Sequence, residues 1–307
     1  MNDPLSELLR VAGVRGSLIS RATLGDAFGV AAPPQARAIF HVPVKGHGWV
    51  RAGDQVVEIG PGDVAVLPKG AAHVVSDTAD RRPVPIGRYP RAVADGGLPL
   101  LHNDVDDIEL DLLCGTFALG SPAARWVTEA MPELLVVRGS DATRSYLDAT
   151  VALLAGEVAW GGPGAAIVSD RLVEVLVVHI VRGWATQSGA DHPGWVAGIQ
   201  DPHIGRVIGA VHQRPSQPWT LPSMAKVAGL SRTRFVKRFT DRVGVPPGAW
   251  LTEWRMAVAQ RALSDGAAVA EAAAAVGYAS EASFTRAFKR VAGTTPTAWR
   301  GRERAFA

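Results

Sequence analysis

The stretch VGYASEASFTRAFKRVAGTTPTAWR, residues 276–300, decides the fold expected for the C-terminal part of the chain. Gly277 can end the preceding alanine-rich helix, because glycine adopts the left-handed backbone conformation at little steric cost. Ser280 or Ser283 can cap a second helix, in which two phenylalanines four residues apart bury one face and basic side chains lie away from it. The pattern predicts a helix-turn-helix whose second helix is basic.

The same landmarks occur a second time, 48 or 49 residues earlier in the chain. Such self-similarity indicates a duplicated structural unit. The repeated positions are Gly229, Phe235, Phe239, Gly244, Pro247 and Trp250, which recur as Gly277, Phe284, Phe288, Gly293, Pro296 and Trp299. Residues 247–263 lie between the copies and predict one linker helix of roughly 25 Å at about 1.5 Å per residue. Successive major grooves on one face of DNA are about 34 Å apart, so the two copies could occupy neighbouring grooves.

The outward faces of the two second helices are the expected DNA contacts. Lysine and arginine can bond to guanine or to phosphates, and threonine can contact the methyl group of thymine. On these grounds the predicted DNA-binding residues are Arg232, Thr233, Val236, Lys237, Glu281, Ala282, Thr285, Arg286 and Lys289.

Length and charge favour two domains with different partners. The 307 residues suffice for two hydrophobic cores. Residues 1–195 hold 16 Lys and Arg against 22 Asp and Glu, whereas residues 196–307 hold 16 against 7. The basic part favours a polyanion, here double-stranded DNA. The chain shows no membrane span or secretory signal, and its single cysteine, Cys114, excludes an intrachain disulfide, so we expect a cytoplasmic protein without a membrane partner.

Short β-branched runs separated by turn residues predict a β-barrel or sandwich between residues 38 and 119. Before them we expect a short helix, Pro4 to Ala12, and then glycine- and proline-rich connections up to residue 35. A strand after residue 107 alternates so that Cys114 faces inward. The candidate strands in the first part of the barrel are residues 38–44, 48–52, 55–59, 63–67 and 72–76.

The stretch GDVAVLPKGAAH, residues 62–73, fits the second sequence motif of the cupin superfamily, and so resembles part of a small barrel that holds a ligand or metal in many relatives. The first cupin motif, with two histidines one residue apart and a nearby glutamate, is not matched. His41, His73 and Cys114 are the candidate effector-binding residues. As metal ligands, together with His102, they lack diagnostic spacing, so we expect neither a metal nor another cofactor. A redox role for Cys114 is disfavoured by its apolar strand and acidic neighbours.

Residues 140–187 show helical periodicity interrupted by Gly-Gly-Pro-Gly at 161–164, which predicts a helical hairpin. Its apolar surface is consistent with core packing and also with a homodimer contact. The fold expected is α+β with two domains. Residues 1–190 form a cupin-like β-barrel with a helical hairpin, residues 191–200 form a linker, and residues 201–307 form an all-α domain with two helix-turn-helix motifs joined by a linker helix.

Residues 200–302 resemble the AraC/XylS family of transcription regulators. The resemblance rests on Ser231-Arg-Thr-Arg-Phe, Trp254-Arg-Met-x-x-Ala, residues 276–290 and Gly293-Thr-Thr-Pro. Gly62-Asp-Val-Ala-Val-Leu-Pro and Leu113-Cys-Gly-Thr-Phe resemble the members with a cupin-like sensor domain. The resemblance implies promoter binding, usually activation with RNA polymerase as a partner, control by a small effector or stress signal, and frequent dimerisation. We therefore expect a regulator and not an enzyme.

Two other functions remain open from the residues. A metal-dependent cupin enzyme fused to a DNA-binding module would need a fuller set of histidines than the chain offers. A DNA-repair protein that accepts alkyl groups would need an activated cysteine, for which Cys114 is poorly placed.

Overall fold

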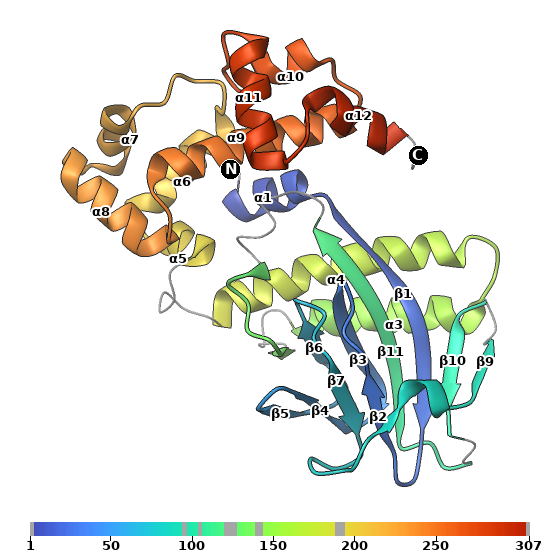
Figure 1. The fold of residues 1–307 in the computed structure, drawn as a ribbon. Coiled ribbons are helices and arrows are strands. Elements are labelled where there is room, and N and C mark those ends of the chain that lie inside the picture. Colours follow the sequence, from blue (N-terminus) through green and yellow to red (C-terminus); the bar gives the residue numbers. More distant parts are fainter. Residues whose placement is uncertain are drawn as a thin grey trace. The chain divides into compact units, whose positions relative to one another are not determined.

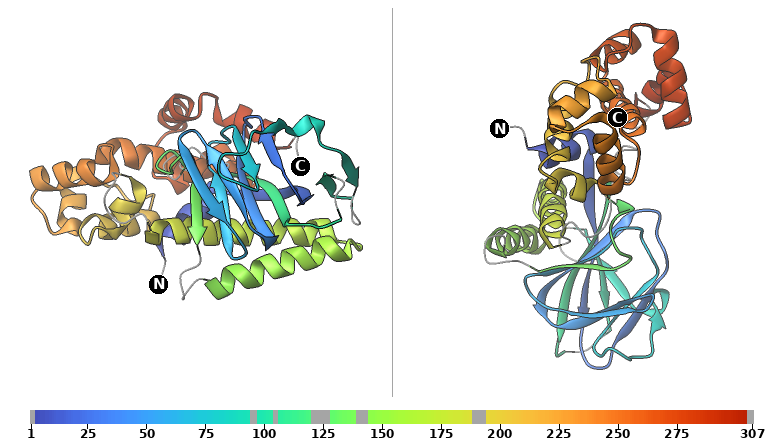
Figure 2. Two further views of the ribbon diagram at one scale, coloured as in Figure 1. Left: turned by 90° about the horizontal axis from the view of Figure 1, so that it is seen from below. Right: turned by 90° about the vertical axis from the view of Figure 1, so that its left-hand side faces the viewer.

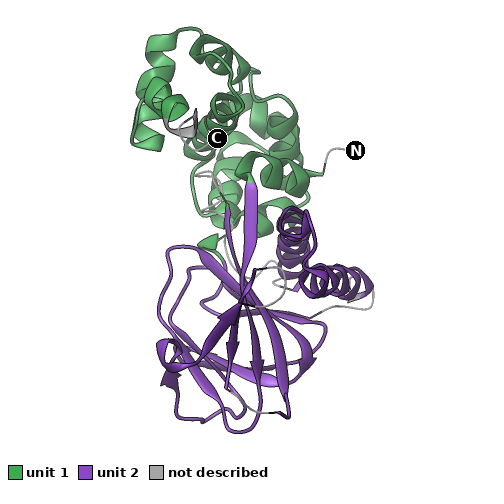
Figure 3. Cartoon of the chain, turned by 90° about the vertical axis from the view of Figure 1, so that its right-hand side faces the viewer, with its two compact units in different colours: residues 1–13, 119–130, 188–307 green, residues 14–118, 131–187 purple. Residues whose placement is uncertain are grey.

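The computed structural model describes residues 3–93, 97–103, 106–119, 128–138, 144–187 and 194–304. The chain forms two compact units, coloured separately in Figure 3. The strand-rich unit comprises residues 14–118 and 131–187, and the helical unit comprises residues 1–13, 119–130 and 188–307. The first helix is thus grouped with the C-terminal helices, although the strands of the other unit follow it directly in sequence.

The strand-rich unit contains two sheets that face each other (Figures 1 and 2). The order of strands in the larger sheet is β12-β6-β3-β11-β1-β10-β9, and that in the smaller is β5-β4-β7-β2-β8. The larger sheet consists of β1 (Val14–Leu24), β3 (Ala38–Gly46), β6 (Asp63–Leu67), β9 (Arg91–Val93), β10 (Pro99–His102), β11 (Leu110–Leu119) and β12 (Leu135–Arg138). The smaller consists of β2 (Gly29–Ala32), β4 (Gly48–Ala52), β5 (Gln55–Ile59), β7 (His73–Ser76) and β8 (Val84–Pro85).

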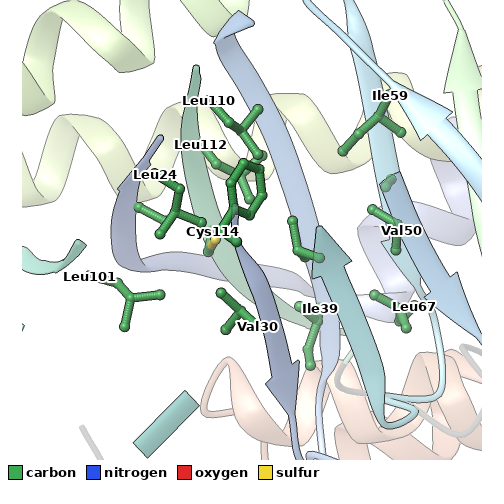
Figure 4. Close-up of a cluster of buried hydrophobic side chains, with 14 of the residues drawn as sticks. Leu24, Val30, Ile39, Val50, Ile59, Leu67, Leu101, Leu110, Leu112 and Cys114 are labelled. Carbon is green, nitrogen blue, oxygen red and sulfur yellow. The ribbon is translucent and has the colours of Figure 1, made fainter. Parts of the chain in front are cut away.

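The core of this unit lies between the two sheets (Figure 4). Val50 and Ile59 reach it from the smaller sheet, and Leu67 and Leu110 from the larger one, all completely buried. Cys114 of β11 belongs to the same cluster, so the predicted inward orientation of this residue is confirmed.

A helical hairpin, α3 (Arg144–Trp160) and α4 (Ala165–Gln187), packs on the strand-rich unit, with α4 along β1. Gly16 permits the close approach, because a Cβ atom there would lie 2.5 Å from Cγ1 of Val173 on α4. On β1, Arg21 also holds β11 through Asp111, with Nε–Oδ1 and Nη2–Oδ2 distances of 2.8 and 2.6 Å. Strand β1 therefore joins the barrel to the helices.

The five strands predicted between residues 38 and 76, and the two helices of the hairpin, are confirmed at nearly the predicted bounds. The prediction of connections up to residue 35 was wrong, because β1 and β2 occupy that segment. Gly16, Ser17, Ser20 and Arg21 interrupt the apolar pattern of β1, and this strand gains its packing from α4 and β11 and not from a regular alternation of its own.

The helical unit contains both predicted helix-turn-helix motifs. The first consists of α7 (Leu221–Ala228) and α8 (Arg232–Val243), the second of α10 (Val269–Ala275) and α11 (Glu281–Ala292), and α9 (Pro247–Ser264) joins them. The remaining helices are α1 (Pro4–Ala12), α5 (Trp195–Gln200), α6 (Ile204–Gln213) and α12 (Pro296–Arg304). The predicted α+β fold class is confirmed. In the described part of the chain, no helix combines the length and apolarity needed to cross a bilayer.

Helices α5 and α1 pack against the helices that carry the two motifs. Helix α5 lies in the segment predicted as a linker, and its Trp195 is 2% exposed and packs with α6 and α8 as neighbours. Residues 191–193 of that segment lie outside the described residues. Helix α1 contacts α6 and α9 and buries Leu8 and Ala12. Asp3 caps α1 by accepting hydrogen bonds from the backbone N–H groups of its first turn.

Candidate nucleic-acid interface and buried histidine cluster

Helix α8 presents the first group of predicted DNA-binding side chains. Ser231 caps it, because its Oγ accepts a hydrogen bond from the backbone N–H of Arg234, and Phe235 and Phe239 are completely buried. On the other side of the helix, Arg232, Thr233 and Lys237 are exposed and Val236 is half-buried. Lys237 Nζ lies 2.7 Å from Oδ2 of the exposed Asp241. The Lys237 ammonium group would break this exposed, weak ion pair with Asp241 when it contacts a base.

Two other basic residues of α8 stabilise the fold. Arg238 Nε donates to the carboxylate of Asp201 at 3.1 and 2.8 Å, and Arg242 Nε lies 3.5 Å from the same group. Asp201 also accepts the backbone N–H groups of His203 and Ile204 at the start of α6. Burial raises the pKa of Asp201. The hydrogen bonds from the two backbone N–H groups and from Arg238 together outweigh this effect, so the pKa lies below its ordinary value. This carboxylate therefore ties α6 to α8.

Helix α11 presents the second group. Ser280 is its cap, with Oγ accepting from the backbone N–H of Ser283 at 3.3 Å, which selects one of the two serines left open by the sequence. Phe284 and Phe288 are completely buried. The predicted DNA-binding residues lie on the solvent side, where Glu281, Ala282, Arg286 and Lys289 are exposed and Thr285 is half-buried. Both second helices thus carry their predicted side chains on accessible faces.

Helix α9 belongs to the cores of both motifs. Trp250 and Trp254 are buried near its start, where Trp250 contacts Phe239 of α8, and Leu263 is buried in the core around α11. Its 18 residues give roughly 27 Å at about 1.5 Å per residue. Arg255 of α9 donates to the backbone carbonyls of Pro215 and Gln217. Both motifs therefore pack against one continuous helix.

Contacts at the turn of the second motif reinforce this connection. Gly277 has a φ of +79°, and a Cβ atom there would lie 2.4 Å from the carbonyl oxygen of Ser216. Ser216 belongs to the loop that Arg255 holds. Gly277 therefore ends α10, as the sequence predicted, and also lets the second motif pack against the loop that precedes α7.

His41, His73 and Cys114, the candidate effector-binding residues, come together in the strand-rich unit. His41 on β3 lies opposite Cys114 on β11, and His73 begins β7 of the other sheet. Nδ1 of His41 lies 3.1 Å from Cys114 Sγ, and its Nε2 lies 2.8 Å from His73 Nε2. Nδ1 of His73 lies 3.0 Å from the carbonyl oxygen of Ala71. We call the three side chains the histidine–cysteine cluster.

The neutral cluster has only one consistent set of donors and acceptors. A carbonyl oxygen can only accept, so His73 carries its proton on Nδ1 and accepts at Nε2. His41 must then donate from Nε2, which leaves its Nδ1 to accept the S–H of Cys114. The hydrogen bonds run in one direction, from Cys114 through both rings to Ala71, and both rings have partners at both nitrogens.

Burial keeps the cluster uncharged. It lowers the pKa of His41 well below its ordinary value, with repulsion from His73 adding to the effect, and it also lowers the pKa of His73, against the hydrogen bond to Ala71. Burial raises the pKa of the Cys114 thiol to about 12, with an opposing contribution from Ser20. A thiol in this state is a poor nucleophile, because thiolate is the reactive form.

The cluster has the geometry of a hydrogen-bonded line. A zinc-type site needs donors that converge on one point, whereas His41 lies between the other two and uses one ring nitrogen for each. Across the described ranges, no group of three or more His, Cys, Asp and Glu has the arrangement of a metal site. His102, the fourth side chain considered, ends β10 opposite Thr23 of β1.

Sequence reasoning missed Asp201. Its signal was present, because an aspartate followed by Pro-His-Ile at the start of an apolar helix is a capping pattern. Its second role, binding Arg238 across 37 residues, depends on tertiary packing and leaves no local trace.

A family model described as "Cupin" matches residues 3–186, and one described as "Helix-turn-helix domain" matches residues 224–302. A Streptomyces lividans protein classed as an AraC-like transcription regulator is 25% identical, with 97% of this chain and 98% of that protein covered. An HTH-type transcriptional regulator of Haemophilus influenzae is 28% identical, with 97% and 98% covered. The RCS-specific HTH-type transcriptional activator RclR of Escherichia coli is 26% identical, with 99% of each covered.

Proposed function

Because the chain belongs to the AraC/XylS family of transcription regulators and carries a cupin domain, we propose that it activates promoters on which α8 and α11 occupy successive major grooves. The observation that carries the proposal is the attachment of both second helices to α9, with their predicted side chains on the solvent side, exposed or half-buried. A helix of roughly 27 Å, lengthened by the motifs at its ends, matches a groove spacing of about 34 Å.

The individual side chains have different roles in this proposal. Arg286 and Lys237 read bases, because both lie on the exposed middle of their helices and both can bond guanine. Arg232 and Lys289, near the helix ends, bind phosphates and position the helices. Thr233, Thr285, Val236 and Ala282 make apolar contacts in the groove, and Glu281 accepts from cytosine.

The histidine–cysteine cluster is proposed to be the part of the cupin domain that responds to a small effector. It joins polar side chains of both sheets beside the apolar core, and both ring nitrogens of each histidine have protein partners. An effector that forms a hydrogen bond with the cluster must break one of these hydrogen bonds and take the place of one partner. Oxidation of Cys114 is a weaker candidate signal, since burial holds it as the thiol.

A second copy of the chain is proposed to cover α3. Tyr146, Leu153 and Trp160 follow one another at intervals of seven residues, and each is about 60% exposed. Seven-residue spacing of large apolar side chains is typical of a seam between two helices. Dimerisation through this helix would place four helix-turn-helix motifs in one regulator.

RNA polymerase is the proposed protein partner, since activation at a promoter acts through it, and the cytoplasm is the proposed location. The alternative of a metal-dependent cupin enzyme is less favoured. Each ring nitrogen of His41 already has a protein partner, and both bonds would have to break before this side chain joined a ligand set.

The proposal is tested by selecting binding sites from random-sequence duplexes with the purified full chain. We expect enriched sites with two short contact segments whose centres are about one helical turn apart. Enrichment of a single segment, or of none, would contradict simultaneous use of α8 and α11.

A further inference from the structure

A pocket of about 250 Å³ lies in the strand-rich unit, where the turn of the α3–α4 hairpin meets the larger sheet. Leu18 of β1 and residues 97–99 form one wall, and the end of α3 and the start of α4 form the other. None of these lining residues belongs to the barrel core or to the histidine–cysteine cluster. The pocket is therefore distinct from the interior of the barrel (Figure 2 shows the two helices against the sheet).

The walls of the pocket combine apolar surface with negative charge. The apolar side chains are Leu18, Leu98, Pro99, Val158, Ala165 and Ala166. The polar side chains are Glu157, Ser169 and Asp170, and the lining, all of it among the described residues, includes no lysine, arginine or histidine. The two carboxylates thus face the pocket without a cation in its walls.

Glu157 is the most informative of these residues. Its Oε2 atom is buried and has no hydrogen-bond partner. A buried polar atom, above all one of a carboxylate, is costly to leave without a partner, and such atoms in folded proteins nearly always have one. The missing partner of Glu157 is thus expected to be a donor that enters the pocket.

Asp170, a largely exposed residue of α4, lines the same pocket. Burial raises the pKa of this carboxyl, and the nearby Glu174 raises it further, against the effect of Arg171. Arg171 is itself bound to Glu174 at 2.8 Å, on the exposed side of α4. A positive charge inside the pocket would offset this effect on Asp170 and would also attract the carboxylate of Glu157.

We propose that this pocket binds a small organic cation, namely a primary ammonium group on a compact apolar body. An ammonium has three donors, which can serve Glu157, Asp170 and the hydroxyl of Ser169, while the apolar walls cover the body. The volume is below the roughly 300–1,000 Å³ typical of sites for drug-sized molecules, which limits the body to one ring or a short chain.

The inference rests on the proposed function only in calling this cation an effector. Binding itself requires no DNA and no change in the histidine–cysteine cluster, and it can be measured on the full chain alone. Amine binding that left promoter affinity unchanged would count against an effector role, and would still support the site.

The test is isothermal titration of the full chain with 2-phenylethylamine, 2-phenylethanol and 3-phenylpropanoate, which differ mainly in charge. We expect the amine to bind, the alcohol to bind at least tenfold more weakly and the carboxylate not to bind. Glu157→Gln and Asp170→Asn should each weaken amine binding at least tenfold, whereas Glu58→Gln, which neutralises an exposed carboxylate on β5 that does not line the pocket, should not.

The circular dichroism spectrum of each variant shows whether it folds. Equal binding of amine and alcohol, absence of saturable amine binding, or full amine affinity in folded Glu157→Gln would each overturn the proposal. Loss of amine binding in the folded Glu58→Gln variant to the same degree as in Glu157→Gln would also overturn it, because general surface charge would then explain the effect.

Discussion

Nε of Arg238 lies 2.8 Å from Oδ2 of Asp201, a carboxylate whose side chain is only 2% exposed. The bond joins α8, which carries predicted DNA contacts, to the first turn of α6. Replacement of Asp201 by alanine removes the buried acceptor of Arg238 and of the backbone N–H groups of His203 and Ile204. We expect the free energy of unfolding to fall by about 2–4 kcal/mol, measured by urea denaturation with tryptophan fluorescence. Asp241→Ala, which removes an exposed carboxylate of α8, should change it by less than about 1 kcal/mol, and equal losses would contradict this role.

His212 makes the helical unit sensitive to acid. Its ring stacks on Trp254 with centroids 3.6 Å apart, and burial lowers its pKa from 6.5 to about 3. The folded state thus keeps it neutral, while the unfolded chain takes up a proton below pH 6.5. The contribution of this group to the free energy of unfolding is fully present above pH 6.5. It decreases by about 1.4 kcal/mol per pH unit as the pH falls from 6.5 toward 3.

His212→Phe should remove this part of the pH dependence. Urea denaturation between pH 7 and pH 5 measures the slope for the parent chain and the variant, with substitution of the exposed His47 by phenylalanine as the control. An unchanged slope in His212→Phe would show that the ring is protonated in the folded state.

Arg286 and Lys237 are expected to discriminate between DNA sequences. Alanine at either position should weaken binding to a selected site by about 1–3 kcal/mol and binding to random DNA by much less, because a base contact is lost. Fluorescence anisotropy with both duplexes measures the difference. Arg261→Ala, which removes a cation of α9 that is paired with Asp265, is the control. Equal losses on both duplexes would assign Arg286 or Lys237 to phosphates.

The apolar seam of α3 is expected to hold a dimer. Leu153→Asp places a charge at the centre of the stripe formed with Tyr146 and Trp160, so it should shift the chain toward monomers. Sedimentation velocity over a range of concentrations measures the change. Asp148→Asn alters another residue of the same helix and should leave the association unchanged. A parent chain that stays monomeric at all concentrations would contradict the proposed dimer.

The periodic parts of the fold were predictable from the sequence. Phe235, Phe239, Phe284 and Phe288 marked the buried faces of α8 and α11, because each motif is local and repeats at a fixed offset. The strands between residues 38 and 76 were also predictable, because turn residues separate their short apolar runs. Strand β1 was not, because α4, more than a hundred residues away, packs along it and closely approaches its Gly16.

The residues of the candidate sites could be predicted only in part from the sequence. The three members of the histidine–cysteine cluster could be chosen by residue type, but the order of its hydrogen bonds depends on the register that sets His41 opposite Cys114. The carboxylates of the pocket could not be found, because Glu157 and Asp170 belong to different helices and meet only through the hairpin and β1. Contacts between distant segments leave no pattern along the chain.

The central claim is that α8 and α11, held by α9, bind one duplex together. Its most direct test is the affinity for a selected site before and after about five base pairs are inserted between the two contact segments. Half a helical turn moves the second segment to the opposite face of the DNA, beyond the reach of a rigid connection. We predict that affinity falls to the level of random DNA. An inserted site bound as tightly as the original would contradict the claim.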